Sequence, residues 1–172
     1  MRIAVGSDHR GYAVKQGLLP HLEALGHCAQ DFGCDGGSGA DYPDIACPLA
    51  MAVASELCGV GILIDGDGMG MSMVANKIHG VRAASASDEI AARRAREHHH
   101  CNVLVIGADL MGDKNVRRII EVFLTATVAG GRHAQRIEKI QLIEEALAKA
   151  HTSKKLPPLW ADFHAEPKGV FS

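Results

Sequence analysis

The stretch that decides the fold is Gly59-Val60-Gly61-Ile62-Leu63-Ile64-Asp65-Gly66-Asp67-Gly68-Met69-Gly70-Met71-Ser72-Met73-Val74-Ala75-Asn76-Lys77. The pattern predicts a short apolar strand over residues 60–65, a glycine-rich turn with two carboxylates, and a helix over 69–77. In an open α/β sheet, ligands bind beyond the carboxyl ends of the strands, where such a turn presents backbone N–H groups and a helix N-terminus to an anion. Asp65 and Asp67 therefore stand where a reactive side chain is expected.

The same alternation of strands and helices continues on both sides of this stretch. Further strands are predicted over residues 2–7, 28–32, 80–84 and 103–106, and further helices over 12–26, 43–57, 87–96, 113–126 and from 132 onward. Gly26 is expected to end the first helix, and Ser87 to cap the one that runs into His98-His99-His100. Five strands alternating with helices favour an α/β fold, in which a five-stranded parallel sheet is covered by helices on both faces.

Length and composition exclude several classes of protein. A chain of 172 residues is expected to form one domain, residues 1–151. An apolar content of 47% disfavours disorder, and no membrane-spanning segment is expected. The net charge of −2 gives no field that would attract nucleic acid. Met1 leads directly into a strand-like segment, which leaves no room for a signal sequence and makes the cytoplasm the expected location.

Two further features concern the cysteines and the end of the chain. The five cysteines are odd in number and contain no C-x-x-C pair, so we expect reduced, mostly buried thiols rather than disulfides or a zinc site. The tail, residues 152–172, contains Pro157, Pro158 and Pro167 among scattered apolar residues, and it cannot be helical throughout. We expect it to pack on the domain or on a neighbouring subunit, with disorder as the alternative.

The glycine-rich turn does not match the common nucleotide-binding motifs. Met71 breaks the G-x-G-x-x-G pattern, and no G-K-[ST] follows. The remaining interpretation is a nest of N–H groups that holds an oxyanion or a phosphate. Asp67 has a structural alternative, which is to cap the helix that begins near Met69. Asp65 needs several hydrogen bonds or a function, because it ends an apolar strand.

Three other groups of polar residues are candidates for the site. Asp8 and His9 follow the first strand directly and should open onto the same edge of the sheet as Asp65, although Asp8 could simply cap a turn. The three consecutive histidines lack metal-ligand spacing and are typical of a helix end. Arg132 and Arg136 lie four residues apart near a helix N-terminus, which suits either a solvated pair or a phosphate clamp.

Taken together, these segments resemble the type B ribose-5-phosphate isomerases and their galactose-6-phosphate isomerase relatives. The resemblance covers residues 1 to about 150 in one register and leaves the tail outside. Its motifs are Gly6-Ser7-Asp8-His9-Arg10-Gly11, Asp41-Tyr42-Pro43, Gly61-Ile62-Leu63-Ile64, Gly66-x-Gly68-x-Gly70-x-Ser72, Ala75-Asn76-Lys77, Arg82-Ala83, Asn102-Val103-Leu104 and Gly130-Gly131-Arg132-His133-x-x-Arg136.

The resemblance implies a three-layer α/β/α Rossmann-like sandwich with the strand order 2-1-3-5-4. It also implies a homodimer, often paired into tetramers, whose active sites combine residues from two subunits. The implied reaction is aldose–ketose isomerisation of a phosphorylated sugar through a cis-enediolate, without a metal or an organic cofactor.

The resemblance also assigns roles to individual positions. Asp8 and His98 match the positions that open the sugar ring, and the amides from Gly66 to Gly70 match the hole that stabilises the enediolate. The positions assigned to substrate or phosphate binding are His9, Tyr42, Gly66, Gly68, Gly70, Ser72, His99, Arg132 and Arg136.

The chain departs from the family pattern at the catalytic turn. Most members have a cysteine as base at the position of Asp65 and a serine or threonine at that of Asp67, while another branch has a glutamate nearer Met69. His99 stands where asparagine is usual, and Asp109 where a phosphate-binding arginine is common. We expect Asp65 to act as the base, with its pKa raised by the second carboxylate at Asp67.

Three alternatives stay open on the sequence alone. The first is a catalytically altered or inactive homologue that binds a sugar phosphate. The second is a divalent metal site made by Asp8, Asp65, Asp67 and the histidines, since carboxylates favour hard cations. The third is a Rossmann-like redox enzyme.

Overall fold

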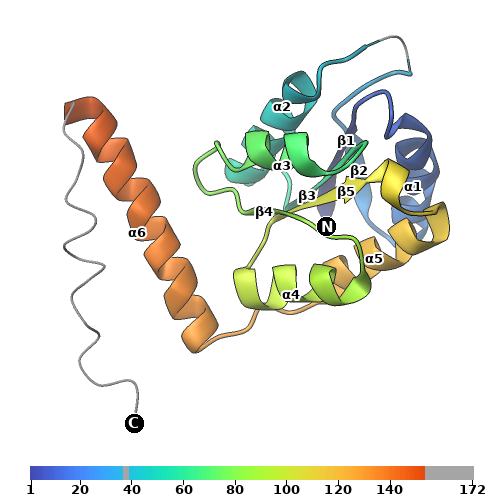
Figure 1. The fold of residues 1–172 in the computed structure, drawn as a ribbon. Coiled ribbons are helices and arrows are strands. Elements are labelled where there is room, and N and C mark those ends of the chain that lie inside the picture. Colours follow the sequence, from blue (N-terminus) through green and yellow to red (C-terminus); the bar gives the residue numbers. More distant parts are fainter. Residues whose placement is uncertain (37–38, 154–172) are drawn as a thin grey trace.

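Strand β3 (Val60–Asp65) is the central strand of the sheet in the computed structural model, which describes residues 1–36 and 39–153 (Figure 1). Within these residues the sheet has five parallel strands in the order β2-β1-β3-β5-β4. In chain order the elements are β1 (Arg2–Ser7), α1 (Tyr12–Ala24), β2 (Cys28–Asp31), α2 (Tyr42–Ala54), β3, α3 (Met69–Ala75), β4 (Ala83–Ser85), α4 (Glu89–His99), β5 (Val103–Gly107), the 3-10 turn η1 (Ala108–Leu110), α5 (Asp113–Thr125) and α6 (Arg132–Ser153). The predicted fold and strand order are confirmed.

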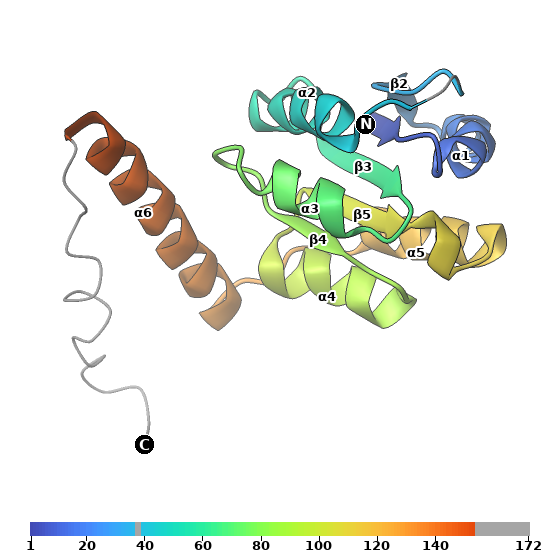
Figure 2. The same cartoon turned by 45° about the horizontal axis from the view of Figure 1, so that its top comes forward.

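Helices cover both faces of the sheet (Figure 2). Alternate residues of a strand point to opposite faces: Ile62 and Ile64 pack in a core with α1, α4 and α5, whereas Leu63 packs in a second core with α2 and α3. All six residues of β3 are therefore buried. Gly61 allows α2 to come close, because a Cβ atom there would lie 2.6 Å from Leu49 Cδ2.

The structure corrects two local predictions. Asp88, not Ser87, caps α4, because its carboxylate accepts a hydrogen bond of 2.7 Å from the Ala91 amide and the helix begins at Glu89. Strand β4 begins at Ala83 rather than at residue 80. Residues 80–82 form a loop instead, in which the backbone N–H of Arg82 donates to a side chain, Asn102 Oδ1, at 2.8 Å.

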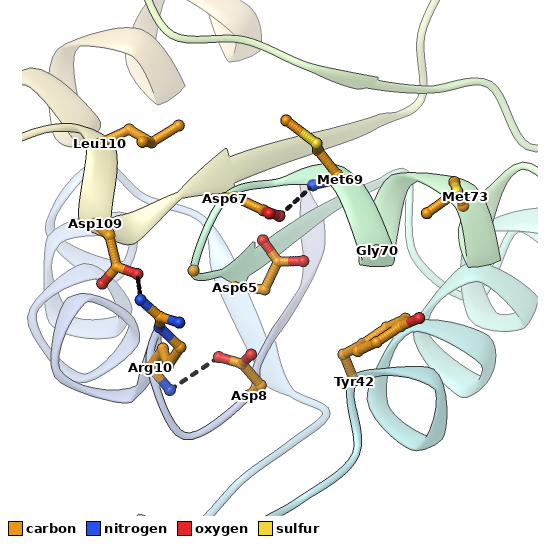
Figure 3. Close-up of a pocket in the computed structure, with 11 residues that line it drawn as sticks. Asp8, Arg10, Tyr42, Asp65, Asp67, Met69, Gly70, Met73, Asp109 and Leu110 are labelled. Atoms are coloured by element: carbon orange, nitrogen blue, oxygen red, sulfur yellow. Dashed lines mark hydrogen bonds and ion pairs between the residues drawn. The ribbon is translucent and has the colours of Figure 1, made fainter.

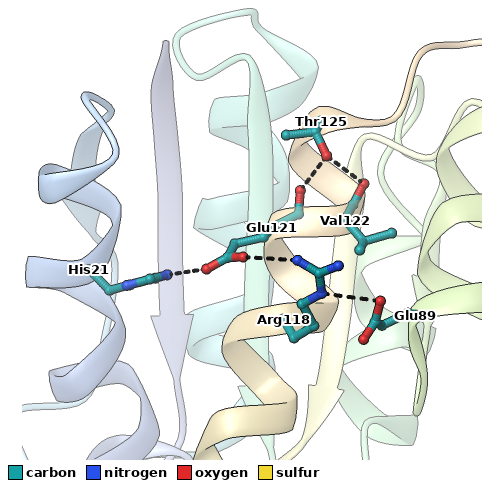
Figure 4. Close-up of polar contacts among 6 residues, drawn as sticks. All are labelled: His21, Glu89, Arg118, Glu121, Val122 and Thr125. Carbon is teal, nitrogen blue, oxygen red and sulfur yellow. Dashed lines mark hydrogen bonds and ion pairs between the residues drawn. The ribbon is translucent and has the colours of Figure 1, made fainter.

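A row of charged side chains joins the helices on one face of the sheet (Figure 4). His21 on α1 lies 2.9 Å from Glu121 on α5, and Arg118 links Glu121 at 3.7 Å to Glu89 on α4 at 3.2 Å. Partly exposed ion pairs of this kind contribute about 0.2–1 kcal/mol each. The apolar packing beneath them therefore accounts for most of the stability of this layer.

Helix α6 extends away from the sandwich (Figures 1 and 2). Its main contact with the sandwich is made by its first turn, which lies against α4. The apolar residues of this helix include Ile137, Ile140, Ile143, Ala146 and Leu147. Ile137 is buried, but Ile140 and Leu147 are 41% and 38% exposed. The predicted tail spans residues 152–172: residues 152 and 153 are the last two of α6, and the expected packing of residues 154–172 lies outside the described residues. Among the described helices, none is long and apolar enough to cross a membrane.

Candidate active site

A cleft of about 670 Å³ opens at the carboxyl edge of the sheet (Figure 3). This is the edge where the turns after β1, β3 and β5 meet, because parallel strands present the same ends to the same side. The residues that line the cleft are Asp8, Arg10, Tyr42, Asp65, Gly66, Asp67, Met69, Gly70, Met73, Asp109 and Leu110. The structure therefore brings together six predicted site residues: Asp8, Tyr42, Asp65, Gly66, Asp67 and Gly70.

Asp65 ends β3 and is the most buried carboxylate of the cleft, with 4% of its surface exposed. One oxygen accepts a hydrogen bond from the Gly68 amide, and the other accepts one of 3.2 Å from the Met71 amide. Burial raises the pKa of the Asp65 carboxyl, and the negative charges of Asp8 and Asp67 add to this rise, whereas the two amide bonds oppose it. The environment thus moves Asp65 toward the range where a carboxylate is a useful base.

The turn after Asp65 depends on glycine. Gly68 has φ +80°, a left-handed conformation that side chains disfavour, and a Cβ atom there would lie 2.5 Å from Ser85 Oγ. This conformation turns the Gly68 amide back toward Asp65. The short helix α3 therefore begins with its first amides directed at carboxylates.

Asp67 and Asp8 each cap backbone groups. The exposed Asp67 accepts a hydrogen bond of 2.9 Å from the Met69 amide at the start of α3, while Gly68 occupies the N-cap position. The buried Asp8 accepts hydrogen bonds of 2.9 and 3.0 Å from the amides of Arg10 and Gly11. Both carboxylates nevertheless line the cleft, so these backbone bonds do not remove them from it.

An ion pair between Arg10 and Asp109 closes one side of the cleft (Figure 3). The sequence analysis did not include Arg10 among the site residues. Arg10 lies in the segment directly after β1, and Asp109 in the segment directly after β5, the two strands beside β3. This position after a neighbouring strand is the sequence signal that could have identified both residues. Asp109 also donates its backbone N–H to the Gly66 carbonyl at 3.1 Å, which ties the turn after β5 to the turn after β3.

The opposite wall is made by Tyr42 and Gly70, with an apolar rim. Tyr42 stands at the start of α2, and a Cβ atom on Gly70 would lie 2.9 Å from its ring. The rim residues Met69, Met73 and Leu110 are 61–63% exposed, and the sequence analysis assigned no role to them. Three further predicted site residues do not line the cleft: His9, Gly68 and Ser72.

Four predicted site residues, His98, His99, Arg132 and Arg136, lie at the other end of the fold. Helix α4 connects two parallel strands and so runs back against them, which places His98 and His99 next to the start of β5. The first turn of α6 is beside them: His98 stacks on His133 with ring centroids 4.2 Å apart. From the start of β5 to Gly107 the strand alone spans roughly 13 Å, four steps of about 3.3 Å each.

The distance between the cleft and the histidines also tests the alternative of a metal site shared by both. Asp65 and the histidines cannot ligate one ion within a single chain at that distance. Among the described residues, no group of three or more His, Cys, Asp or Glu side chains is arranged to hold a metal ion.

Comparison with known proteins identifies the family. Residues 3–140 match the Ribose/Galactose Isomerase family model. The chain is 39% identical to ribose-5-phosphate isomerase B of Escherichia coli, covering 84% of this chain and 97% of the relative. It is 36% identical to D-erythrulose-4-phosphate isomerase of Pectobacterium atrosepticum, covering 84% and 95%. The structure of Clostridium thermocellum ribose-5-phosphate isomerase B superposes with a TM-score of 0.83 at 41% identity, covering 84% of this chain and 98% of that one. The chain belongs to the Ribose/Galactose Isomerase family.

Proposed function

We propose that the protein is an aldose–ketose isomerase that acts on a phosphorylated sugar, with Asp65 as the base. The observation that carries the proposal is the position of Asp65, a buried carboxylate with a raised pKa at the cleft where the strands end. Membership of the isomerase family supports the reaction class. A carboxylate in this position is suited to moving a proton between two neighbouring carbons of one substrate.

The proposed reaction is a proton transfer through a cis-enediolate. The Asp65 carboxylate removes the proton from C2 of the open-chain aldose, the C–H electron pair forms the C1–C2 double bond, and the carbonyl electrons move to O1. The protonated Asp65 then returns the proton to C1, while the O2 proton passes to O1 and the C2 carbonyl forms. Because the electrons stay within the substrate, the step requires no redox cofactor.

The active site of the proposed enzyme combines two copies of the chain. His98, His99, Arg132 and Arg136 lie too far from Asp65 to contact the same sugar phosphate within one protomer. A homodimer that places the first turn of α6 at the cleft of its partner would supply these residues. In that arrangement Asp8 and His98 open the sugar ring, and the two arginines, with His9, hold the phosphate through charge-assisted hydrogen bonds.

The length of the sugar is the next question for experiment. The two named relatives act, by their names, on a five-carbon and a four-carbon sugar phosphate. Tetrose, pentose and hexose phosphates therefore form the panel to test. The cleft of about 670 Å³ accommodates small sugars of this kind.

The test is turnover of this panel together with exchange of the substrate C2 proton in heavy water. Wild type should convert at least one sugar phosphate, and Asp65→Asn should lose about 10²–10⁴-fold in kcat, the usual contribution of a general base. Asp44→Asn makes the same chemical change at an exposed position in the first turn of α2 and should retain activity. Equal turnover by wild type and Asp65→Asn would remove Asp65 as the base.

One observation favours the second candidate function, a homologue that binds a sugar phosphate without converting it. Both oxygens of Asp65 accept amide hydrogen bonds, which satisfies the buried carboxylate without any catalytic role. This candidate predicts saturable binding of a sugar phosphate by wild type with no proton exchange. Exchange would exclude it.

A further inference from the structure

Three amides at the catalytic turn are already engaged. The Gly68 and Met71 amides donate to Asp65, and the Met69 amide donates to Asp67. An oxyanion hole works when N–H groups are directed at the atom where negative charge develops. While these carboxylates hold the three amides, the turn has fewer donors left for an enediolate oxygen.

The cleft is also strongly acidic. The carboxylates of Asp8, Asp65, Asp67 and Asp109 line it, and among the described residues of the lining Arg10 is the one cation. Formation of an enediolate adds a negative charge beside these carboxylates. Coulomb repulsion at such short range opposes the reaction unless a positive group lies next to the reacting carbons.

Arg10 is held at the required place by both its backbone and its side chain. Its amide donates to Asp8 Oδ1 at 2.9 Å, and its guanidinium is paired with Asp109. A Cβ atom on Gly66, the residue directly after Asp65, would lie 2.8 Å from Arg10 Nε. The bond to Asp109 uses one of five N–H groups, and the side chain is 57% exposed, so donors remain for a ligand in the cleft.

We infer that Arg10 is a catalytic residue whose guanidinium stabilises the enediolate oxygens in place of the three engaged amides, and that Asp109 is the positioning residue that fixes it. The inference rests on the proposed isomerase function and names the group that carries the developing charge. The guanidinium binds the oxyanion more strongly than the neutral carbonyl of the substrate, which is the condition for acceleration of the chemical step.

The decisive experiment separates kcat from KM in Arg10→Gln. Removal of one oxyanion-stabilising donor costs about 10²–10³-fold in kcat, and we expect KM to change by less than about threefold, because the interaction is specific to the enediolate. Arg10→Lys keeps the charge and should recover at least about tenfold of that loss. A hydroxamate of the phosphorylated aldonic acid, which mimics the paired enediolate oxygens, should lose affinity for Arg10→Gln by the same factor as kcat.

Two control variants test whether the loss of kcat is specific to Arg10 and whether Asp109 acts through it. Arg2→Gln makes the same change in charge at an exposed residue at the opposite end of β1 and should leave kcat unchanged. Asp109→Asn should lower kcat by about tenfold, and it should add no further loss in the Arg10→Gln background, because residues that act through one another are not additive.

Three results would overturn the inference: unchanged kcat in Arg10→Gln, a rise in KM with unchanged kcat, or unchanged hydroxamate affinity. Failure of the proposed function is recognised separately and earlier, since wild type would then neither convert nor exchange any sugar phosphate of the panel.

Discussion

Two inactive variants should restore activity when they exchange subunits. One chain carries Asp65→Asn at the cleft, and the other carries Arg132→Gln with Arg136→Gln at the first turn of α6. The two regions are separated by at least the length of β5, roughly 13 Å. A five-carbon sugar phosphate built from single bonds of about 1.5 Å extends only about 10 Å, so one protomer cannot present both regions to it.

The size of the effect follows from the symmetry of a dimer. Random exchange of equal amounts makes about half of the dimers mixed, and each mixed dimer has one site with every residue intact, so about a quarter of wild-type turnover should return. The assay is isomerase activity before and after joint unfolding and refolding of the two variants. A chain that carries all three substitutions should stay inactive after the same treatment. Activity no greater than the sum of the separate variants would refute the composite site.

Three further predictions concern the stability and reactivity of single side chains. Lys15→Met should lower the free energy of unfolding by about 3 kcal/mol in a urea titration. The side chain of Lys15 is only 1% exposed, and its ammonium group donates to both oxygens of Asp31 and to two backbone carbonyls. A variant as stable as wild type would show that this buried cation is dispensable. Asp65→Asn should raise the free energy of unfolding more at about pH 7 than at about pH 3. Burial raises the pKa of Asp65 in the folded chain, so ionisation of this carboxyl above its unfolded-state pKa favours the unfolded chain, and the substitution removes that effect. An equal change at both pH values would contradict this. In iodoacetamide labelling at about pH 8, the exposed Cys28 should react while Cys101 stays unmodified, because burial raises the pKa of Cys101 to about 11; equal labelling would show that this burial is lost in solution.

The sequence predicted the sheet well because strand identity and strand exposure are local properties. The apolar run of β3 and the polar residues just after β1 and β3 indicated both the central strand and the edge that holds the site. Capping was predicted less well. Ser87 and Asp88 are both good cap residues, and only the backbone conformation decides which side chain reaches the amide of Ala91.

The sequence by itself determined the fold and the location of the glycine-rich turn with its two carboxylates. Only the tertiary structure decided which amides those carboxylates occupy, and only the order of the strands brought Arg10 to Asp109, a residue 99 positions away. The physical reason is that periodicity and turn chemistry act between neighbours in the chain, whereas the charge of the cleft depends on which strand ends meet. The same order of strands placed His98 and Arg132 at the edge away from Asp65, so the turn that the sequence identified is one half of the site we propose.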